Sequence, residues 1–272
     1  MIEKLVIFDY SGTLSPDAVR FAEDDNLTEE LERSGLAALG VGDPETFWNE
    51  IANPTWQEGS TTPVGYGEVI FRRIKEAFFP AVLDEEVRVI AARFVDSYLT
   101  HSPIDDRWRP ILEKLGEDPA VMTVIATDHY AEATGYIVRY LGEMGAGAMS
   151  LKDAPGAAPF GVANSADMGA HKADRAFWEV LRGSLQLDAV RSVLIVDDFG
   201  FNEEAGDSYA DRQKVDGRKD ATLALLEGVF GVPVYRVSFM WERGGDPEKD
   251  GKARGDLIAR ASAEIERYLS EK

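Results

Sequence analysis

Short apolar runs that stop at polar side chains are the feature that most constrains the fold of this chain. Continuous runs of about four to eight apolar residues are typical of strands buried on both faces of a parallel sheet. The runs are Leu5–Phe8, Val121–Ala126, Phe160–Ala163, Val193–Val196 and Val232–Phe239. Amphipathic segments with helical spacing, Ala131–Leu141 and Asp174–Leu187, alternate with them. This alternation predicts an α/β fold.

A stretch of about 100 residues after the first run breaks the alternation. It contains no clear buried strand, and its apolar residues recur at helical spacing. The expected helices are Thr28–Leu39, Pro44–Ile51, Tyr66–Phe79, Asp84–Leu99 and Arg107–Leu115, with breaks at Gly40–Pro44, Asn53-Pro54, Gly59–Pro63, Pro80 and Ser102-Pro103. We therefore predict an inserted helical domain over 16–117 and a core formed by 1–15 and 118–272. In that core, Gly142–Pro159 and Asp207–Asp220 are expected to be loops.

The charge and the composition exclude several classes of protein. Lys and Arg number 29 and Asp and Glu 49, so the formal net charge is −20, which argues against a protein that coats nucleic acid or an anionic membrane. The chain has no cysteine, which excludes disulfides, a thiolate nucleophile and a cysteine-ligated metal. The apolar run near the N-terminus is too short for a signal peptide or a transmembrane helix, so we expect a cytoplasmic protein.

Acidic and hydroxyl side chains follow three of the apolar runs. Asp9 follows the first, Thr127 the second, and the pair Asp197-Asp198 the fourth. Because the ligand crevice of a parallel α/β sheet lies beyond the carboxyl ends of its strands, these side chains are expected to converge. Each of them could instead cap a helix. Two adjacent carboxylates repel each other, and a hard cation such as Mg²⁺ explains that pair better.

Four segments, in order along the chain, resemble the motifs of the haloacid dehalogenase-like (HAD) superfamily. They are Asp9-Tyr10-Ser11-Gly12-Thr13-Leu14, Thr127, the segment Ser165–Asp174 with Lys172, and Val193–Asp198 continuing to Glu203. The helical insertion falls between the first and the second, where one class of HAD cap falls. The family usually has Lys-Pro where this chain has Lys172-Ala173. The resemblance implies a Rossmann-like core with a mobile helical cap domain over 16–117.

The resemblance also implies the roles of individual residues. Asp9 would be the nucleophile that forms an aspartyl phosphate. Thr127 would donate a hydrogen bond to the phosphoryl group, and Lys172 would stabilise its charge, with Lys152 as the competitor for that role. The ligands of Mg²⁺ would be Asp9, the Ser11 carbonyl, Asp197 and Asp198.

Three further residues of the motif segments are expected near the substrate or its loop. Gly12 and Asp128 are expected to contact the substrate, Gly12 through its backbone geometry. Thr13 is expected to brace the first motif loop through a hydrogen bond.

Ser11 departs from the pattern of the family's phosphatases, which usually carry a second Asp at this position. A serine hydroxyl is a poor general acid or base near pH 7, and such help is typically worth about 10²–10⁴-fold. His129 and Asp128 are candidates for a substitute. Without one, a substrate whose leaving group needs little protonation, such as an acyl phosphate, fits best.

These residues predict a Mg²⁺-dependent phosphatase or phosphotransferase that acts on a small phosphorylated metabolite. Ser11 leaves three alternatives open, namely a degenerate binding protein, a phosphonatase and a haloacid dehalogenase. A phosphonatase would need a cap lysine, for which Lys75 is the clearest candidate. A dehalogenase needs no metal, which the Asp197-Asp198 pair argues against.

Substrate choice is expected to come from the predicted cap domain. Its candidate features are Trp48, Trp56, Tyr66, Arg72 and Arg73, together with the Gly59–Gly67 loop. Aromatic residues at helical spacing more often form a core, so the sequence assigns neither a substrate nor an oligomeric state.

Overall fold

A parallel sheet of six strands forms the centre of the molecule. The computed structural model describes residues 2–78, 81–153, 156, 158–185, 187–204, 206, 207, 210, 212–242, 244 and 246–271. The strands are β1 (Lys4–Phe8), β2 (Val121–Thr127), β3 (Ala148–Ser150), β4 (Phe160–Asn164), β5 (Ser192–Asp197) and β6 (Val234–Ser238). Their order is β3-β4-β2-β1-β5-β6, and every pair is parallel. The predicted α/β fold is confirmed. The short strand β3 was not expected, because Gly142–Pro159 was predicted to be a loop.

Helices cover both faces of the sheet, and the strands alternate their side chains between these two layers. Leu5 and Ile7 of β1 pack with α10 (Arg175–Leu185) and α11 (Arg212–Phe230). Val6 and Phe8 belong to the opposite core, to which α7 (Arg109–Glu117), α8 (Ala133–Glu143) and α12 (Pro247–Ser270) contribute. Each central strand is therefore buried on both sides, as its continuous apolar sequence predicts.

The prediction of a loop at Asp207–Asp220 is wrong from residue 212 onward, because α11 begins there. The charged residues of its first half hide the helical pattern. The apolar residues that α11 buries are Val215, Leu226, Val229 and Phe230, and most of them lie beyond the segment predicted as a loop. Among the described helices, none combines the length and the apolarity needed to cross a bilayer.

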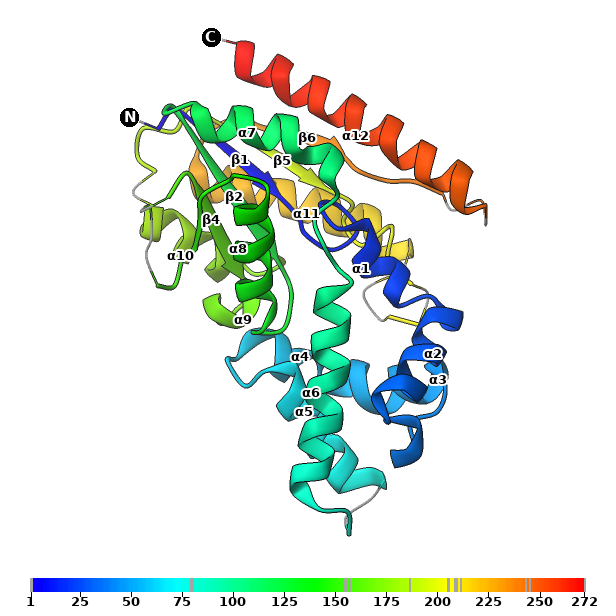
Figure 1. The fold of residues 1–272 in the computed structure, drawn as a ribbon. Helices are drawn as coiled ribbons and strands as arrows, with labels where there is room; N and C mark the ends of the chain where they lie inside the picture. Colours follow the sequence, from blue (N-terminus) through cyan, green and yellow to red (C-terminus); the bar gives the residue numbers. More distant parts are fainter. Residues whose placement is uncertain are drawn as a thin grey trace.

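Residues 16–108, which we call the helical segment, lie beyond one end of the sheet, away from both termini (Figure 1). Its elements are α1 (Pro16–Phe21), α2 (Asp24–Ser34), η1 (Ala37–Leu39), α3 (Pro44–Thr46), η2 (Phe47–Ala52), α4 (Asn53–Thr61), α5 (Tyr66–Arg73), η3 (Ile74–Phe78), α6 (Asp84–Thr100) and η4 (Asp106–Trp108). Its described residues contain no named strand, as predicted.

One predicted helix break is wrong, and another begins later than predicted. Asn53-Pro54 opens α4 without interrupting the chain of helical turns, because a proline in the first turn replaces an N–H that would have no partner in the helix. The break predicted over Gly59–Pro63 is present but starts later, because Gly59 lies inside α4, which ends at Thr61 before the extended Thr62. The predicted end of a helix at Phe79 and the break at Pro80 lie outside the described residues.

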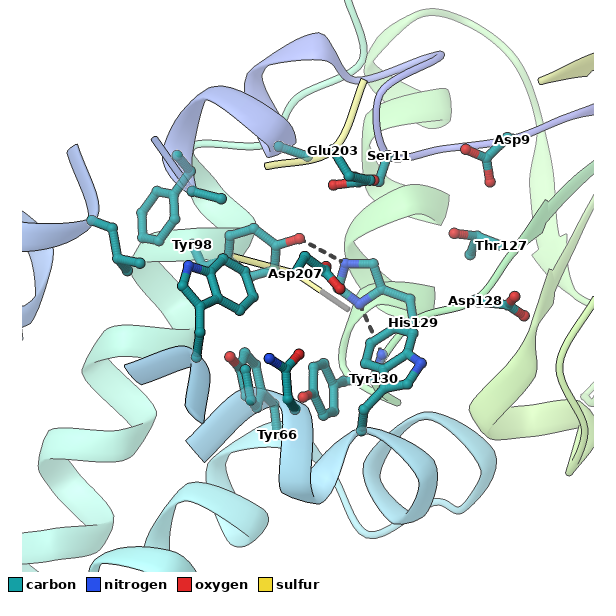
Figure 2. Close-up of a pocket in the computed structure, with 18 of the residues that line it drawn as sticks. Asp9, Ser11, Tyr66, Tyr98, Thr127, Asp128, His129, Tyr130, Glu203 and Asp207 are labelled. Carbon is teal, nitrogen blue, oxygen red and sulfur yellow. Dashed lines mark hydrogen bonds between the residues drawn. The ribbon is translucent and has the colours of Figure 1, made fainter. Parts of the chain in front are cut away.

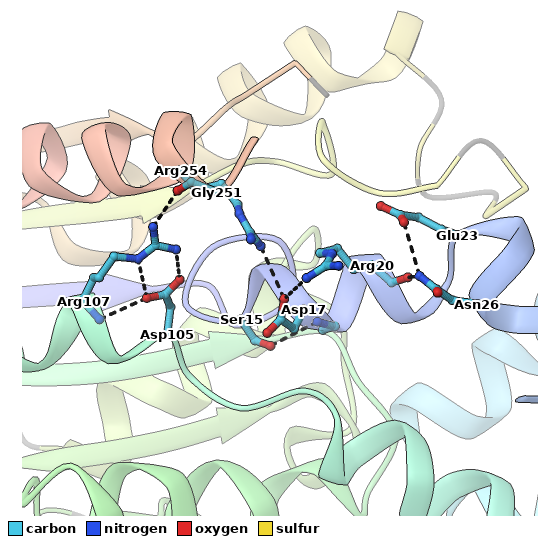
Figure 3. A network of polar contacts seen from close by, with 10 residues as sticks. Ser15, Asp17, Arg20, Glu23, Asn26, Asp105, Arg107, Gly251 and Arg254 are labelled. Carbon is cyan, nitrogen blue, oxygen red and sulfur yellow. Dashed lines mark hydrogen bonds and ion pairs between the residues drawn. The ribbon is translucent and has the colours of Figure 1, made fainter. Parts of the chain in front are cut away.

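The N-terminal half of α12 is joined to both connections between the helical segment and the sheet (Figure 3). Arg254 of α12 lies 3.4 Å from Asp17 at the start of α1. Arg107, on the returning connection, donates a hydrogen bond of 2.7 Å to the carbonyl of Gly251 and also binds Asp105. The backbone N–H of Asp105 in turn donates to the carbonyl of Leu14. Both connections between the helical segment and the sheet therefore contact α12, and they are also hydrogen-bonded to each other.

Candidate active site

The ends of β1 and β5 bring three carboxylates together. Asp9 follows β1, and its backbone N–H donates to the carbonyl of Val196 on the neighbouring β5. Asp197 is the last residue of β5, and Asp198 follows it. Ligand oxygens of these three aspartates all lie within 4.8 Å of one another, and all three side chains are buried. The convergence expected from the parallel sheet is therefore present.

Lys172 supplies positive charge to this cluster. Its Nζ donates to Asp9 Oδ1 at 2.6 Å and to Asp197 Oδ2 at 3.0 Å. The competitor, Lys152, lies elsewhere, 3.3 Å from Asp167, with its side chain 48% exposed. Of the two lysines that the sequence left in competition, only Lys172 reaches Asp9.

One lysine does not balance three buried acids. Burial raises the pKa of Asp9 to about 7, against the opposing effect of Lys172, and the nearby charge of Asp197 raises it further. The pKa of Asp198 is raised by burial and by the charges of Asp9 and Asp197. A hard divalent cation, which prefers carboxylate oxygens, would favour the ionised form of both side chains. The residues present thus fit a Mg²⁺ site.

The loop after β1 is shaped by Gly12 and by an asparagine from the fourth motif. Gly12 has a φ of +72°, and a Cβ there would lie 3.0 Å from Asp198 Oδ2, so both backbone and space favour glycine. Asn202 donates to the carbonyls of Gly12 and Phe239, and its backbone N–H donates to Asp198 Oδ2. Asn202 thereby fixes the glycine turn against the acidic pair.

Thr13 does not brace this loop as expected. Its hydroxyl is buried and has no hydrogen-bond partner within the described part of the chain. The bracing at this residue comes from the backbone, because Trp108 Nε1 donates to the Thr13 carbonyl at 3.2 Å.

Thr127 and Asp128 continue from β2 toward the same site (Figure 2). Thr127 is the last residue of the strand, and Asp128 Oδ1 accepts a hydrogen bond of 2.8 Å from the backbone N–H of Lys172. Burial raises the pKa of Asp128. Asp128 thus contacts the backbone of Lys172. The contact of Asp128 with substrate stays a prediction.

His129 is buried and held as a neutral imidazole. Its Nδ1 accepts from the backbone N–H of Tyr130 at 2.8 Å, so Nε2 carries the proton and donates to the Tyr98 hydroxyl at 3.1 Å. Burial lowers the pKa of His129 to about 4. An imidazole that is neutral at pH 7 does not supply the protonated acid that Ser11 fails to supply.

These strand-end residues form the floor of a cavity of about 100 Å³ whose opposite wall is aromatic (Figure 2). Cavities of about 150 Å³ accept benzene, so a cavity of about 100 Å³ has room for only a small group. The floor consists of Asp9, Ser11, Thr127, Asp128, His129, Lys172, Asp197 and Asp198. The helical segment contributes the aromatic side chains of Phe21, Phe47, Trp48, Trp56, Tyr66, Phe94 and Tyr98, and Tyr130 joins them from the core.

The charged residues predicted for substrate selection lie outside this cavity. Arg72 binds Glu58 and Glu68, and Arg73 binds Glu50. Lys75 Nζ lies 2.9 Å from Asp84, so the clearest candidate for a phosphonatase lysine is also engaged elsewhere. Among the described residues that line the cavity, Lys172 is the one Lys or Arg.

The loop predicted over Gly59–Gly67 packs on the core at the edge of the cavity. A Cβ on Gly59 would lie 2.3 Å from the Tyr130 ring, which requires glycine at this contact. The rings of Tyr66 and Tyr130 stack with their centroids 3.7 Å apart. Glu132 accepts from the backbone N–H groups of Tyr66 and Gly67 at the start of α5. The segment after β2 therefore anchors the aromatic wall.

Several solved structures of HAD-like proteins are similar to this chain at low sequence identity. Similar solved structures include 2-haloacid dehalogenase from Pseudomonas syringae pv. tomato (TM-score 0.47, 21% identity, 78% of this chain and 84% of that chain). L-2-haloacid dehalogenase from Xanthobacter autotrophicus has a TM-score of 0.46 and 15% identity, over 89% of this chain and 80% of that chain. A predicted HAD-like family hydrolase from Porphyromonas gingivalis has a TM-score of 0.48 and 13% identity, over the full length of both chains. No protein-family model and no curated protein matches the sequence.

Sequence reasoning missed Asn202, Tyr98 and Asp207. Asn202 is buried, and its place in the fourth motif segment, soon after the acidic pair, is the sequence signal that could have identified it. Tyr98 and Asp207 line the cavity from α6 and from the chain after the fourth motif. Nothing in the spacing of either residue separates it from an ordinary helix or loop residue.

Proposed function

We propose that this chain is a Mg²⁺-dependent phosphatase or phosphotransferase that acts on a small phosphorylated metabolite through an aspartyl phosphate on Asp9. The observation that carries the proposal is the buried cluster of three carboxylates within 4.8 Å of one another, with Lys172 bonded to two of them. Such a cluster suits a phosphoryl group held beside a hard cation.

The metal ligands in this proposal are Asp9, Asp197, Asp198 and the backbone carbonyl of Ser11. When bound, Mg²⁺ would neutralise phosphoryl charge and reduce its repulsion of the attacking carboxylate. Both oxygens of Asp197 already accept hydrogen bonds, from Phe199 N–H at 2.6 Å and from Lys172 at 3.0 Å. Asp197 would therefore share its oxygens with these donors.

The remaining chemistry belongs to the side chains of the floor. An oxygen of ionised Asp9 attacks phosphorus, and the bond between phosphorus and the leaving-group oxygen breaks. Lys172 stabilises the charge that spreads over the phosphoryl oxygens, and Thr127 donates a hydrogen bond to one of them. Water then attacks phosphorus, which releases inorganic phosphate and restores the Asp9 carboxylate.

Ser11 decides which leaving groups this site can expel. The serine lines the cavity, and its hydroxyl does not ionise near pH 7, so the leaving oxygen departs with little protonation from the protein. His129 is neutral and bonded to Tyr98, so it gives little compensation. A leaving group of low basicity therefore suits the site best.

A phosphoester panel measured with Mg²⁺ and with a chelator tests the proposal. Acetyl phosphate and aryl phosphates should turn over fastest, and chelation should stop the reaction. Asp9→Asn should lower turnover by at least about 10⁴-fold, because the nucleophile is lost. Circular dichroism should show that the variant is folded, and Asp153→Asn, an exposed acid outside the cavity, should retain activity. Turnover that survives in Asp9→Asn or in chelator would overturn the proposal.

A binding protein without turnover is the second candidate, and the serine at position 11 is the observation that favours it. In that case no ester of the panel would be hydrolysed, while inorganic phosphate with Mg²⁺ would still raise the melting temperature. Release of halide from 2-haloacids in the presence of chelator would instead identify a dehalogenase.

A further inference from the structure

We propose that Tyr98 recognises the organic part of the substrate by donating a hydrogen bond to it. The cavity would then select a phosphate ester whose leaving group carries an acceptor oxygen, such as a short hydroxyalkyl ester. This inference rests on the proposed phosphatase function and names a substrate class for the same site. It is carried by the direction of the hydrogen bonds at the aromatic wall, where Tyr98 and Tyr130 line the cavity (Figure 2).

His129 fixes the direction of the hydrogen bond at the Tyr98 hydroxyl. The Nδ1 atom of His129 accepts a hydrogen bond of 2.8 Å from the backbone N–H of Tyr130, so this nitrogen carries no proton. In a neutral imidazole the proton is then on Nε2, which lies 3.1 Å from the Tyr98 hydroxyl oxygen. Burial lowers the pKa of His129 to about 4, so the ring is neutral at pH 7. The Tyr98 oxygen is therefore the acceptor of this bond.

The hydroxyl proton of Tyr98 is left for a ligand. A phenol oxygen that accepts one hydrogen bond still has its own proton to donate. Within the described part of the chain, the bond from His129 is the one that this hydroxyl makes. Burial raises the pKa of Tyr98 well above its ordinary value, so the phenol keeps its proton at pH 7. A ligand oxygen at the wall would accept from this donor, whereas a hydrocarbon chain would leave the donor unpaired.

A second phenol of the same cavity also has a hydroxyl without a partner. Tyr130 is 5% exposed, and its buried hydroxyl makes no hydrogen bond with any described residue. The Thr55 and Tyr66 hydroxyls are near enough to oppose the rise in the Tyr130 pKa that burial causes, but neither forms a hydrogen bond with it. Thr55 instead donates to the carbonyl of Ile51 at 2.7 Å. Buried polar groups without a partner are rare, and a functional role is one explanation for them.

The leaving group that the wall favours also suits the floor. An electronegative oxygen close to an alkoxide withdraws electrons and lowers its basicity. A short hydroxyalkyl group therefore departs with less protonation than the corresponding alkyl group, which suits a site that has Ser11 in place of an acid. The cavity of about 100 Å³ limits the leaving group to a few carbons.

Pairs of esters that differ in one group test the inference. In each pair, 2-hydroxyethyl, 3-hydroxypropyl or 4-hydroxybutyl phosphate is compared with the ester in which a methyl group replaces the hydroxyl. The three chain lengths allow for the reach from the floor to Tyr98. In the pair of the right length, kcat/KM should be about five- to tenfold higher for the hydroxyl ester. Equal kcat/KM within every pair would overturn the inference and leave the phosphatase function standing.

Tyr98→Phe removes the proposed donor and keeps the aromatic ring. It should lower kcat/KM several-fold more for the hydroxyl ester than for its methyl partner. Tyr136→Phe is the matched control, because the Tyr136 hydroxyl binds Asp96 outside the cavity, and it should leave the preference unchanged. Equal losses on both esters in Tyr98→Phe would assign its hydroxyl to the phosphate or to the fold and overturn the inference, as would an unchanged preference.

Tyr130→Phe tests the second hydroxyl by stability as well as by activity. Because this hydroxyl is buried without a partner, its removal should leave the melting temperature without ligand unchanged or higher. The preference for the hydroxyl ester should nevertheless fall. A lower melting temperature together with an unchanged preference would show a structural role and contradict the assignment of Tyr130.

Phosphonates separate recognition from catalysis. In 3-hydroxypropylphosphonate and butylphosphonate a CH₂ group replaces the bridging oxygen, so the proposed reaction does not cleave them. Titration calorimetry with Mg²⁺ should show tighter binding of the hydroxyl compound, and the difference should shrink in Tyr98→Phe. This result without turnover of any ester would support recognition by Tyr98 and overturn the phosphatase proposal. Equal binding of the two compounds without turnover of any ester would overturn both proposals.

Discussion

The floor and the wall of the cavity are built in different ways by different parts of the chain. On the floor, each acid is fixed by a strand end and by hydrogen bonds to backbone groups, such as those from Phe199 to Asp197 and from Asn202 to Asp198. The wall consists mainly of packed rings from several helices. Directional bonds hold reacting atoms to a fraction of an ångström, whereas packed rings define a shape and an electrostatic surface. We therefore expect the floor to set the reaction and the wall to set the substrate.

The largest effect expected from a floor residue outside the nucleophile is that of Lys172→Met. In the proposed mechanism Lys172 stabilises the transition state, so its removal should lower kcat/KM for an activated phosphoester by about 10²–10³-fold. Lys152→Met is the matched control, because Lys152 lies on the surface beside Asp167. Steady-state kinetics with saturating Mg²⁺ compare the two. Similar losses in both variants would break the distinction between the floor and the rest of the surface.

The second effect is a pH dependence of Mg²⁺ binding. Asp9 has its pKa raised to about 7, and the carboxylate must lose its proton to bind a cation. Mg²⁺ affinity should therefore weaken by about tenfold for each pH unit below 7 and become nearly constant above pH 8. Titration calorimetry between pH 5.5 and 8.5 measures this. A constant affinity down to pH 5.5 would show that Asp9 is not a ligand that titrates in this range.

The floor could be predicted from the sequence because its residues follow buried strands. Apolar runs identify β1, β2 and β5, and the parallel sheet then brings Asp9, Thr127 and Asp197 to one edge whatever their separation along the chain. The sequence favoured Lys172 over Lys152 as the active-site lysine only because of the motif around Lys172. Asn202 was missed because its hydrogen bonds reach Gly12, which is distant in sequence.

The wall could not be predicted to the same degree. Trp48, Trp56 and Tyr66 were named as candidates, and all three line the cavity. Helical spacing does not tell which aromatic residues pack inside a helical layer and which face a cavity, because both lie on the apolar side of a helix. Arg72 and Arg73, named with them, form surface ion pairs.

Ser11→Asp would sharpen the comparison by adding to the floor the acid that this chain lacks. We expect a gain of about tenfold for a simple alkyl phosphate, a part of the 10²–10⁴-fold that general acid–base help can supply. For p-nitrophenyl phosphate, whose leaving group departs without protonation, the variant should gain little. The difference between the two substrates is the measurement. Equal rates for both proteins on the alkyl ester would indicate that another group, such as His129, already supplies the proton.

The smallest effect concerns the link between the floor and the wall. Arg254 of α12 lies 3.4 Å from Asp17, with side-chain exposures of 12% and 44%, and the Nε of Arg254 is buried without a partner among the described residues. Partial burial strengthens the attraction between Arg254 and Asp17, whereas the buried Nε without a hydrogen bond destabilises the fold. Because these two effects oppose each other, Arg254→Met should lower the free energy of unfolding by at most about 1 kcal/mol.

Urea unfolding of Arg254→Met against Lys114→Met measures this link. Lys114 of α7 binds Glu266 of α12, the helix that also carries Arg254, at 2.8 Å, but both side chains are about half exposed. That variant should change stability by only a few tenths of a kcal/mol. Because the Arg254 pair joins α12 to the start of the helical segment, its loss should leave Mg²⁺ affinity unchanged and raise only the KM of the ester. A loss of Mg²⁺ affinity in Arg254→Met would mean that the floor depends on how the wall is attached, and that the two halves of the cavity are not independent.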